Sequence, residues 1–200
     1  MFLLRLIGAR ERKIGKRKKG MDRDLILYER FLSGDAKALE TLVVRYSDNL
    51  IRFAYLYVKD SAAAEDIAED VFVALLLKKK PFTQKAKLTT YLYKIARNKS
   101  IDYLRRRKKT LPMEDVDVIL HSECFERDLE NKERNQTLYR CIAALPEQYR
   151  EILLLHYFED FSIPQICKIL QKSAKQVYNL LSRAKLSLKK SLQEEGVHEP

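Results

Sequence analysis

The segment from Leu88 to Arg107 constrains the fold more than any other part of the chain. Its apolar residues recur at the spacing of an α-helix and share one side, whereas its charged positions on the other side are basic. The apolar positions are Leu88, Tyr91, Leu92, Ile95, Ala96 and Tyr103. The basic positions are Lys94, Arg97 and Arg105. A helix of this kind has to bury one face, so it belongs in a helical bundle whose opposite face is cationic.

The same region carries an unusual concentration of positive charge. Between Lys78 and Lys109 there are thirteen Lys and Arg residues and a single acid, Asp102. Two tyrosines, Tyr91 and Tyr93, follow the loop 80–85 directly, and we expect their rings to be exposed. A basic face beside exposed aromatic rings is typical of a surface that binds nucleic acid with unstacked bases. The competing interpretation is the solvated face of an ordinary bundle helix.

The residues that precede this segment also have helical spacing. We predict helices over 22–32, over 36–58 with Asp35 as the N-cap, and over 61–79. The expected buried stripe of the third helix is Ala64, Ile67, Ala68, Val71, Leu75 and Leu76. The chain has only 5 Gly and 5 Pro among 200 residues, and no long strand-like alternation. The predicted fold class is therefore all-α, with two helical domains joined by a flexible linker.

The third predicted helix has an acidic face. Its outward positions Glu65, Asp66, Glu69 and Asp70 have no base near them between residues 61 and 73. Like charges four residues apart destabilise a helix mildly, so this pattern is not explained by helix stability. An uncompensated acidic patch on a chain of net charge +11 indicates a basic protein partner. The alternative is a favourable interaction of the first two acids with the helix N-terminus.

After Pro112 the composition changes. Residues 114–133 hold eight acids and two bases, which predicts a partly extended acidic linker. From about Asn131 the helical spacing returns. Pro146 then suits the first turn of a further helix.

Two capping boxes, Ser162 with Gln165 and Ser173 with Gln176, lie eleven residues apart. A short helix, a tight turn and a longer basic helix predict a helix-turn-helix, although an αα-hairpin of a bundle has the same outline. The expected buried stripe of the longer helix is Val177, Leu180, Leu181, Ala184 and Leu188. This register leaves the candidate base-reading and phosphate-binding residues facing outward: Lys175, Gln176, Tyr178, Asn179, Ser182, Arg183 and Lys185.

Residues 1–21 form a basic N-terminal extension. Residues 1–20 hold eight bases and one Glu, so they contribute +7 of the net charge of +11. Their apolar part precedes their basic part, which is the reverse of a secretory signal. Two interpretations stay open: a mis-assigned start, with Met21 as the first residue, or a basic tail that adds non-specific affinity for nucleic acid.

Several other classes of protein are not favoured. Cys124, Cys141 and Cys167 lack the spacing of a disulfide framework, which predicts free thiols in the cytoplasm. His121 and Cys124 are not followed by a second pair, so we predict no zinc site. The longest apolar run, 71–77, is too short to cross a membrane. We find no phosphate-binding glycine loop, metal-ligand set or nucleophile–base pair, so we predict neither an enzyme nor a cofactor.

Three motifs occur in order along the chain. They are AEDIAEDVF at 64–72, YLYKIARNKSIDYLRRR at 91–107, and a segment at 145–185 that starts LPEQYREILLLHYF and ends SAKQVYNLLSRAK. Their order and spacing are more specific than any one of them alone. Over about residues 22–192 the chain resembles the sigma-70 family of RNA polymerase sigma factors, of the compact extracytoplasmic-function type.

The resemblance implies a region 2 domain at 22–109, an acidic linker at 110–130 and a region 4 domain at 131–192. Members of this family bind core RNA polymerase and direct it to promoters. Their first domain reads and helps to melt the −10 element, and their second domain reads the −35 element. The implied partners are promoter DNA, the clamp coiled coil of the largest polymerase subunit, the flap of the second-largest subunit, and an anti-sigma factor.

The resemblance also implies roles for particular residues. The acidic residues Glu65, Asp66, Glu69 and Asp70 match the surface that docks on the clamp. The residues implied at the −10 element are Phe82, Tyr91, Tyr93, Lys94, Arg97, Asn98 and Arg105. The chain departs from the family pattern where Tyr91 replaces a frequent Trp and where the turn has Gln171 and Lys172 instead of Gly and an apolar residue. The alternative function is a helix-turn-helix regulator that acts without joining polymerase.

Overall fold

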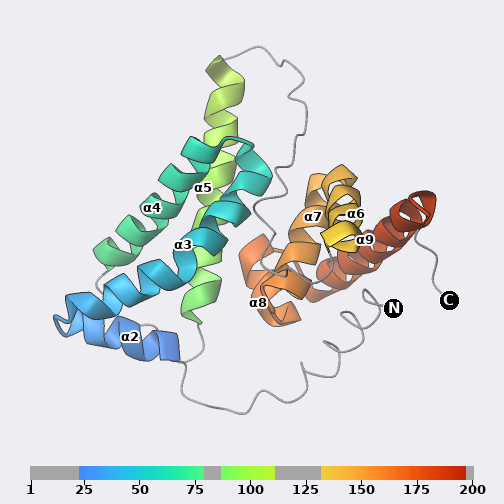
Figure 1. Ribbon diagram of the computed structural model, residues 1–200. Coiled ribbons are helices and arrows are strands. Elements are labelled where there is room, and N and C mark those ends of the chain that lie inside the picture. The colour runs from blue at the N-terminus through green and yellow to red at the C-terminus, as the bar shows by residue number, and fades with distance from the viewer. Residues whose placement is uncertain (1–22, 79–86, 111–131, 197–200) are drawn as a thin grey trace. The chain divides into compact units, whose positions relative to one another are not determined.

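The computed structural model describes residues 23–78, 87–110 and 132–196, and all the regular structure in those ranges is helical (Figure 1). The chain divides into two compact units. One holds α2 to α5, and the other holds α6, α7, α9 and most of α8. The predicted all-α class with two helical units is therefore confirmed.

The first unit is built around α3 (Ala36–Val58). This helix contacts α2 (Arg23–Leu32), α4 (Ser61–Lys78) and α5 (Leu88–Thr110), and α4 also contacts α5 (Figure 1). The side chains that form the core are 5% exposed or less: Leu42, Leu50, Phe53, Ala54, Ile67, Val71, Leu75, Leu88, Leu92 and Ala96. These are largely the apolar positions that helical spacing predicts.

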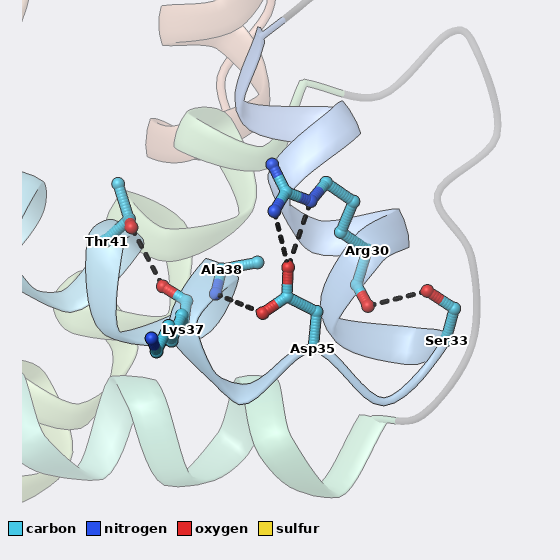
Figure 2. A network of polar contacts seen from close by, with 6 residues as sticks. All are labelled: Arg30, Ser33, Asp35, Lys37, Ala38 and Thr41. Atoms are coloured by element: carbon cyan, nitrogen blue, oxygen red, sulfur yellow. Dashed lines mark hydrogen bonds and ion pairs between the residues drawn. The ribbon is translucent and has the colours of Figure 1, made fainter.

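Asp35 joins the end of α2 to the start of α3 (Figure 2). One of its carboxylate oxygens accepts the Ala38 N–H at 3.3 Å, as predicted for an N-cap. The other accepts two hydrogen bonds from the Arg30 guanidinium, at 3.0 and 2.6 Å. These bonds from Arg30 hold the pKa of Asp35 below its ordinary value of 3.8. A second link lies along the same two helices, where Asp24 pairs with Arg45 and accepts a hydrogen bond from Tyr46.

The second unit contains α6 (Lys132–Ala144), α7 (Glu147–Leu153), the π-helix η2 (Leu154–Phe158), α8 (Ile163–Leu170) and α9 (Ala174–Glu194). In this unit α9 packs against α6 and α7. The end of α6 is held by Arg150, whose Nη1 donates to the Ala143 carbonyl at 2.6 Å. Burial of this guanidinium lowers its pKa. Pro146 lies at the N-cap of α7, one position before the first turn.

Both predicted capping boxes are present. The Ser173 N–H donates to Gln176 Oε1 at 2.9 Å, and the Gln176 N–H donates to Ser173 Oγ at 3.3 Å. The Ser162 N–H likewise donates to Gln165 Oε1, at 3.1 Å. After the first box, α8 ends at Leu170, residues 171–173 form a turn, and α9 starts at Ala174. This is the outline of a helix-turn-helix.

The turn depends on a left-handed residue. Gln171 has φ 55 and ψ 42, and its N–H and that of Lys172 both reach the Cys167 carbonyl, the latter at 3.1 Å. Glycine is the usual residue at such a helix end, because a Cβ is strained there. The side chain of Gln171 therefore makes the turn less stable than it could be.

Replacing Gln171 by Gly should stabilise the second unit. The left-handed conformation costs a non-glycine residue roughly 1–2 kcal/mol, and the extra entropy of unfolded glycine takes back about 0.5–1 kcal/mol. We expect a net gain of up to about 1 kcal/mol in the free energy of unfolding, measured by urea denaturation. Lys172→Gly is the matched control, because its φ is not positive, and it should destabilise. Equal destabilisation by both changes would contradict the strain argument.

Several predictions fall outside the described residues. These are the ones for the basic extension 1–21, the loop that contains Phe82, and most of the linker, including His121 and Cys124. They stay predictions. Within the described part, Cys141 is buried and Cys167 is half-buried, both as free thiols.

Candidate protein-docking and nucleic-acid surfaces

The acidic face of α4 faces solvent. Glu65, Asp66, Glu69 and Asp70 are all exposed. Asp70 makes an ion pair with Lys99 of α5 at 2.8 Å, which the spacing within α4 could not reveal. Within the described residues the other three carboxylates have no ion pair. The face therefore keeps most of its negative charge available to a partner.

The face continues toward the end of α4 as an apolar strip. Val73 is 48% exposed, Leu76 38% and Leu77 75%. These positions follow Glu69 and Asp70 at helical spacing, so they lie on the same side of the helix. The prediction that Leu76 is buried is wrong, because the buried side of α4 extends to Ala63 and Phe72 and leaves Leu76 at its edge. We call the acids and these three residues together the α4 surface.

The cationic side of α5 is also exposed. Lys94, Asn98 and Arg105 are exposed, and Arg97 is half-buried. Arg105 Nη1 lies 3.3 Å from the carboxylate of Asp102, one turn earlier. A row of bases with a short polar side chain between them suits contacts to a phosphate backbone.

Tyr93 is not part of this exposed side. It is 1% exposed, and its ring centroid lies 5.0 Å from that of Phe53. The expectation of an exposed ring is therefore wrong. Because α5 contacts both α3 and α4, it buries a wider arc than a helix with one neighbour, and Tyr93 and Ser100 fall within that arc.

Tyr91 lies at the edge of the buried arc. Its side chain is half-buried, and Lys78 Nζ lies 3.8 Å from the centroid of its ring. Burial lowers the pKa of the Lys78 ammonium and raises the pKa of the Tyr91 hydroxyl. Sequence spacing gave no signal for this contact, because it joins the last residue of α4 to the first turn of α5.

The outward side of α9 is polar and basic. Lys175, Gln176, Tyr178, Asn179, Ser182 and Arg183 are exposed, as predicted from the register. Tyr178 is 58% exposed near the start of the helix. Lys185 is half-buried, and its Nζ lies 5.5 Å from the Tyr157 ring centroid. Gln176 already uses its amide oxygen as the acceptor of the capping box, so only its amide nitrogen is left to contact a base.

Among the described residues there is no group of three His, Cys, Asp or Glu side chains that could hold a metal ion. No helix in the described part of the chain is both long and apolar enough to span a membrane.

Comparison with protein families gives two matches. Residues 42–110 match the family model of sigma-70 region 2, and residues 135–188 match that of sigma-70 region 4. The RNA polymerase sigma-H factor of Pseudomonas aeruginosa is 29% identical over 184 residues, which cover 86% of this chain and 95% of that protein. The ECF RNA polymerase sigma-E factor of Escherichia coli is 29% identical over 182 residues, which cover 85% and 94%.

Solved structures show the same fold. The structure of CnrH in complex with the cytosolic domain of CnrY has a TM-score of 0.61 at 23% identity, and the match covers 86% of this chain and 99% of that one. The sigma factor RpoE of Bartonella quintana, in complex with the anti-sigma factor NepR, has a TM-score of 0.59 at 20% identity. That match covers 79% of this chain and 98% of the other.

The two matched regions fall on the two helical units, in the same order as in the resemblance drawn from the motifs. The first matched region contains the whole of α4 and α5, and the second contains α7, α8 and most of α9. The relatives match along nearly their whole length. The chain belongs to the sigma-70 family of RNA polymerase sigma factors, and it is of the extracytoplasmic-function type.

Proposed function

We propose that this protein binds core RNA polymerase through the α4 surface and directs it to promoters, with α5 at the −10 element and α9 at the −35 element. The observation that carries this proposal is the solvent-facing row of acids on α4, in the same unit as the cationic side of α5. One surface suits a basic protein partner and the other suits DNA. A DNA-binding regulator that acts alone would need only the second.

The partner of the α4 surface is proposed to be the clamp coiled coil of the largest polymerase subunit. Negative charge on Glu65, Asp66 and Glu69 would steer a basic helix toward the site. The exposed Val73 and Leu77 would then bury apolar area against the same helix, which adds affinity that salt does not screen. The flap of the second-largest subunit is the proposed contact of the second unit.

Charge reversal at the acids should weaken docking. We expect Asp66→Lys combined with Glu69→Lys to reduce affinity for core polymerase by about tenfold or more at low salt, and by less at high salt. Asp70 is left unchanged because its ion pair with Lys99 helps to hold α4 on α5. Fluorescence anisotropy with labelled protein and core enzyme measures the affinity.

The matched control is Glu29→Lys combined with Glu40→Lys. Both residues are exposed in the same unit, and the change in net charge is the same. The control should bind core polymerase within about twofold of the wild type. If both double variants lose affinity equally, only net charge matters and the docking assignment is wrong.

Strand opening at the −10 element is assigned to α5. An unstacked base loses a few kcal/mol of stacking energy, which an aromatic side chain can partly restore. Tyr91 is the described aromatic residue in this position that keeps part of its ring in solvent, whereas Tyr93 is buried. Lys94 and Arg97 would hold the phosphates on either side.

Tyr91→Ala and Lys94→Ala should each reduce promoter melting while core binding is preserved. The physical reason is the loss of a stacking platform in one variant and of a phosphate contact in the other. Permanganate reactivity of thymines on a mapped promoter measures melting. Tyr91→Phe keeps the ring and should melt normally, as should Lys37→Ala, which removes an exposed lysine of α3. If thymines react normally with permanganate in both Tyr91→Ala and Lys94→Ala, α5 has no role in melting, and its basic side is simply solvated.

Sequence reading at the −35 element is assigned to the first turns of α9. A recognition helix enters the major groove with its N-terminal end. Asn179 can pair with adenine, and Arg183 with guanine or a phosphate. Gln176 is a weaker candidate than its position suggests, because its side-chain oxygen is already bound to the Ser173 N–H.

Asn179→Ala should relax the preference at one −35 base pair, at a cost of about 1–3 kcal/mol for the preferred base. Promoter activity across a randomised −35 library measures the preference. Lys185→Ala should instead lower activity evenly across sequences. Gln193→Ala, an exposed amide near the other end of α9, is the control and should change nothing. An unchanged profile for Asn179→Ala would place base reading elsewhere.

Regulation by a protein partner is proposed on fold similarity. The solved structure of RpoE with a similar fold is a complex with an anti-sigma factor. We propose that this protein also has an anti-sigma partner and that it acts in the cytoplasm, with no catalytic activity of its own. Transcription reconstituted from core polymerase, this protein and genomic DNA fragments tests the central proposal. Absence of promoter-specific transcripts would contradict it and favour a regulator that acts alone.

A further inference from the structure

The contact between Lys78 and Tyr91 joins the end of α4 to the start of α5. The 3.8 Å between Lys78 Nζ and the ring centroid is well within the range of a cation–π interaction. Two other lysines of the described residues lie over tyrosine rings, Lys59 at 5.6 Å and Lys185 at 5.5 Å. The Lys78 ammonium is therefore much closer to its ring than either of these.

The surroundings of this pair are partly dry. Both side chains are half-buried, and burial shifts the pKa of each toward its neutral form. A cation–π contact strengthens when its groups lose water. A lysine in the last turn of a helix is also favoured by the helix dipole, which could explain its presence there. The dipole does not explain why the ammonium lies over an aromatic ring that belongs to the next helix.

The Lys78 ammonium covers one face of the Tyr91 ring. Lys78 Nζ lies 3.8 Å from the centre of the ring, within the space that a base stacked on the same face would fill. Lys78 and a base therefore cannot share this face of Tyr91. A base that stacks on this face must displace the ammonium, and it brings with it the phosphate to which it is attached. A displaced ammonium beside a phosphate has a stronger partner than the ring it left.

We propose that Lys78 is a positioning residue for strand opening: it holds the Tyr91 ring until an unstacked base replaces it, and then binds the adjoining phosphate. The inference rests on the proposed function of Tyr91 at the −10 element. It adds a residue that the family resemblance and the sequence pattern did not single out. It also gives Tyr91 a defined orientation before DNA arrives, which reduces the entropy lost on stacking.

The test is a double-mutant cycle on the rate of promoter opening, with the full chain and core polymerase. A fluorescent adenine analogue in the −10 element of a mapped promoter reports opening. Lys78→Met keeps the aliphatic stem and removes the charge, and we expect it to slow opening about three- to tenfold. The slope of the logarithm of the rate against the logarithm of salt concentration should become shallower by about 1. Lys78→Arg should stay within about twofold of the wild type, because guanidinium also stacks on rings.

The coupling to Tyr91 separates positioning from a general charge effect. In a Tyr91→Leu background, Lys78→Met should slow opening by less than about twofold, because the ring it positions is gone. Lys87 is an exposed lysine directly before α5, and Lys87→Met should slow opening by the same factor in both backgrounds. Thermal unfolding of each variant shows whether the unit is intact, and Lys78→Gln, which also removes the charge, provides the test again if Lys78→Met unfolds.

Each other outcome overturns the inference. If Lys78→Met opens promoters at the wild-type rate, Lys78 has no role in opening. If it opens them faster, Lys78 hinders the stacking of the base on Tyr91. The factors by which Lys78→Met and Tyr91→Leu slow opening could multiply in the double variant. Lys78 would then be a phosphate contact that acts independently of Tyr91. These results leave the proposed function intact as long as the wild type opens promoters. If the wild type with core polymerase opens none, the proposed function and this inference fail together.

Discussion

The packing of α5 against both α3 and α4 fixes the surfaces of the first unit. Leu88, Leu92 and Ala96 are fully buried in it, which sets the rotation of the helix about its axis. With that rotation, Lys94 and Asn98 face solvent. A rotation that turned Lys94 toward α3 would bury an unpaired ammonium, at a penalty on the order of several kcal/mol. The burial of the apolar side of α5 therefore determines that its cationic side faces solvent.

The same packing explains why the unfavourable charge pattern of α4 persists. Its two like-charge pairs cost the isolated helix about 0.2–0.5 kcal/mol each, whereas each fully buried Val or Leu contributes about 1.5–3 kcal/mol. Val71 and Leu75 are fully buried, so the core decides that α4 forms. Lys99 offsets the charge of Asp70 alone. A charge pattern that lowers stability and makes no compensating contact within the protein is expected at functional sites.

Local signals predicted the helices well, and contacts between helices were predicted poorly. Asp35 and Ser173 cap the helices at which they were placed, because a cap depends on bonds within a few residues. The burial of Tyr93 and the exposure of Leu76 depend on how many neighbours a helix has and on which sides, which periodicity does not contain. The Lys78–Tyr91 contact was not predictable for the same reason, since it joins two helices across the segment 79–86.

In the second unit, a structural role and the proposed reading role compete for the Gln176 side chain. Releasing Gln176 to a base would leave the Ser173 N–H without its acceptor at the start of α9. Part of any energy gained from the base would be lost at the cap. Asn179 and Arg183 are exposed, and neither side chain caps a helix in the described structure. Base preference should therefore depend more on these two residues, with Gln176 acting mainly to fix the backbone that presents them.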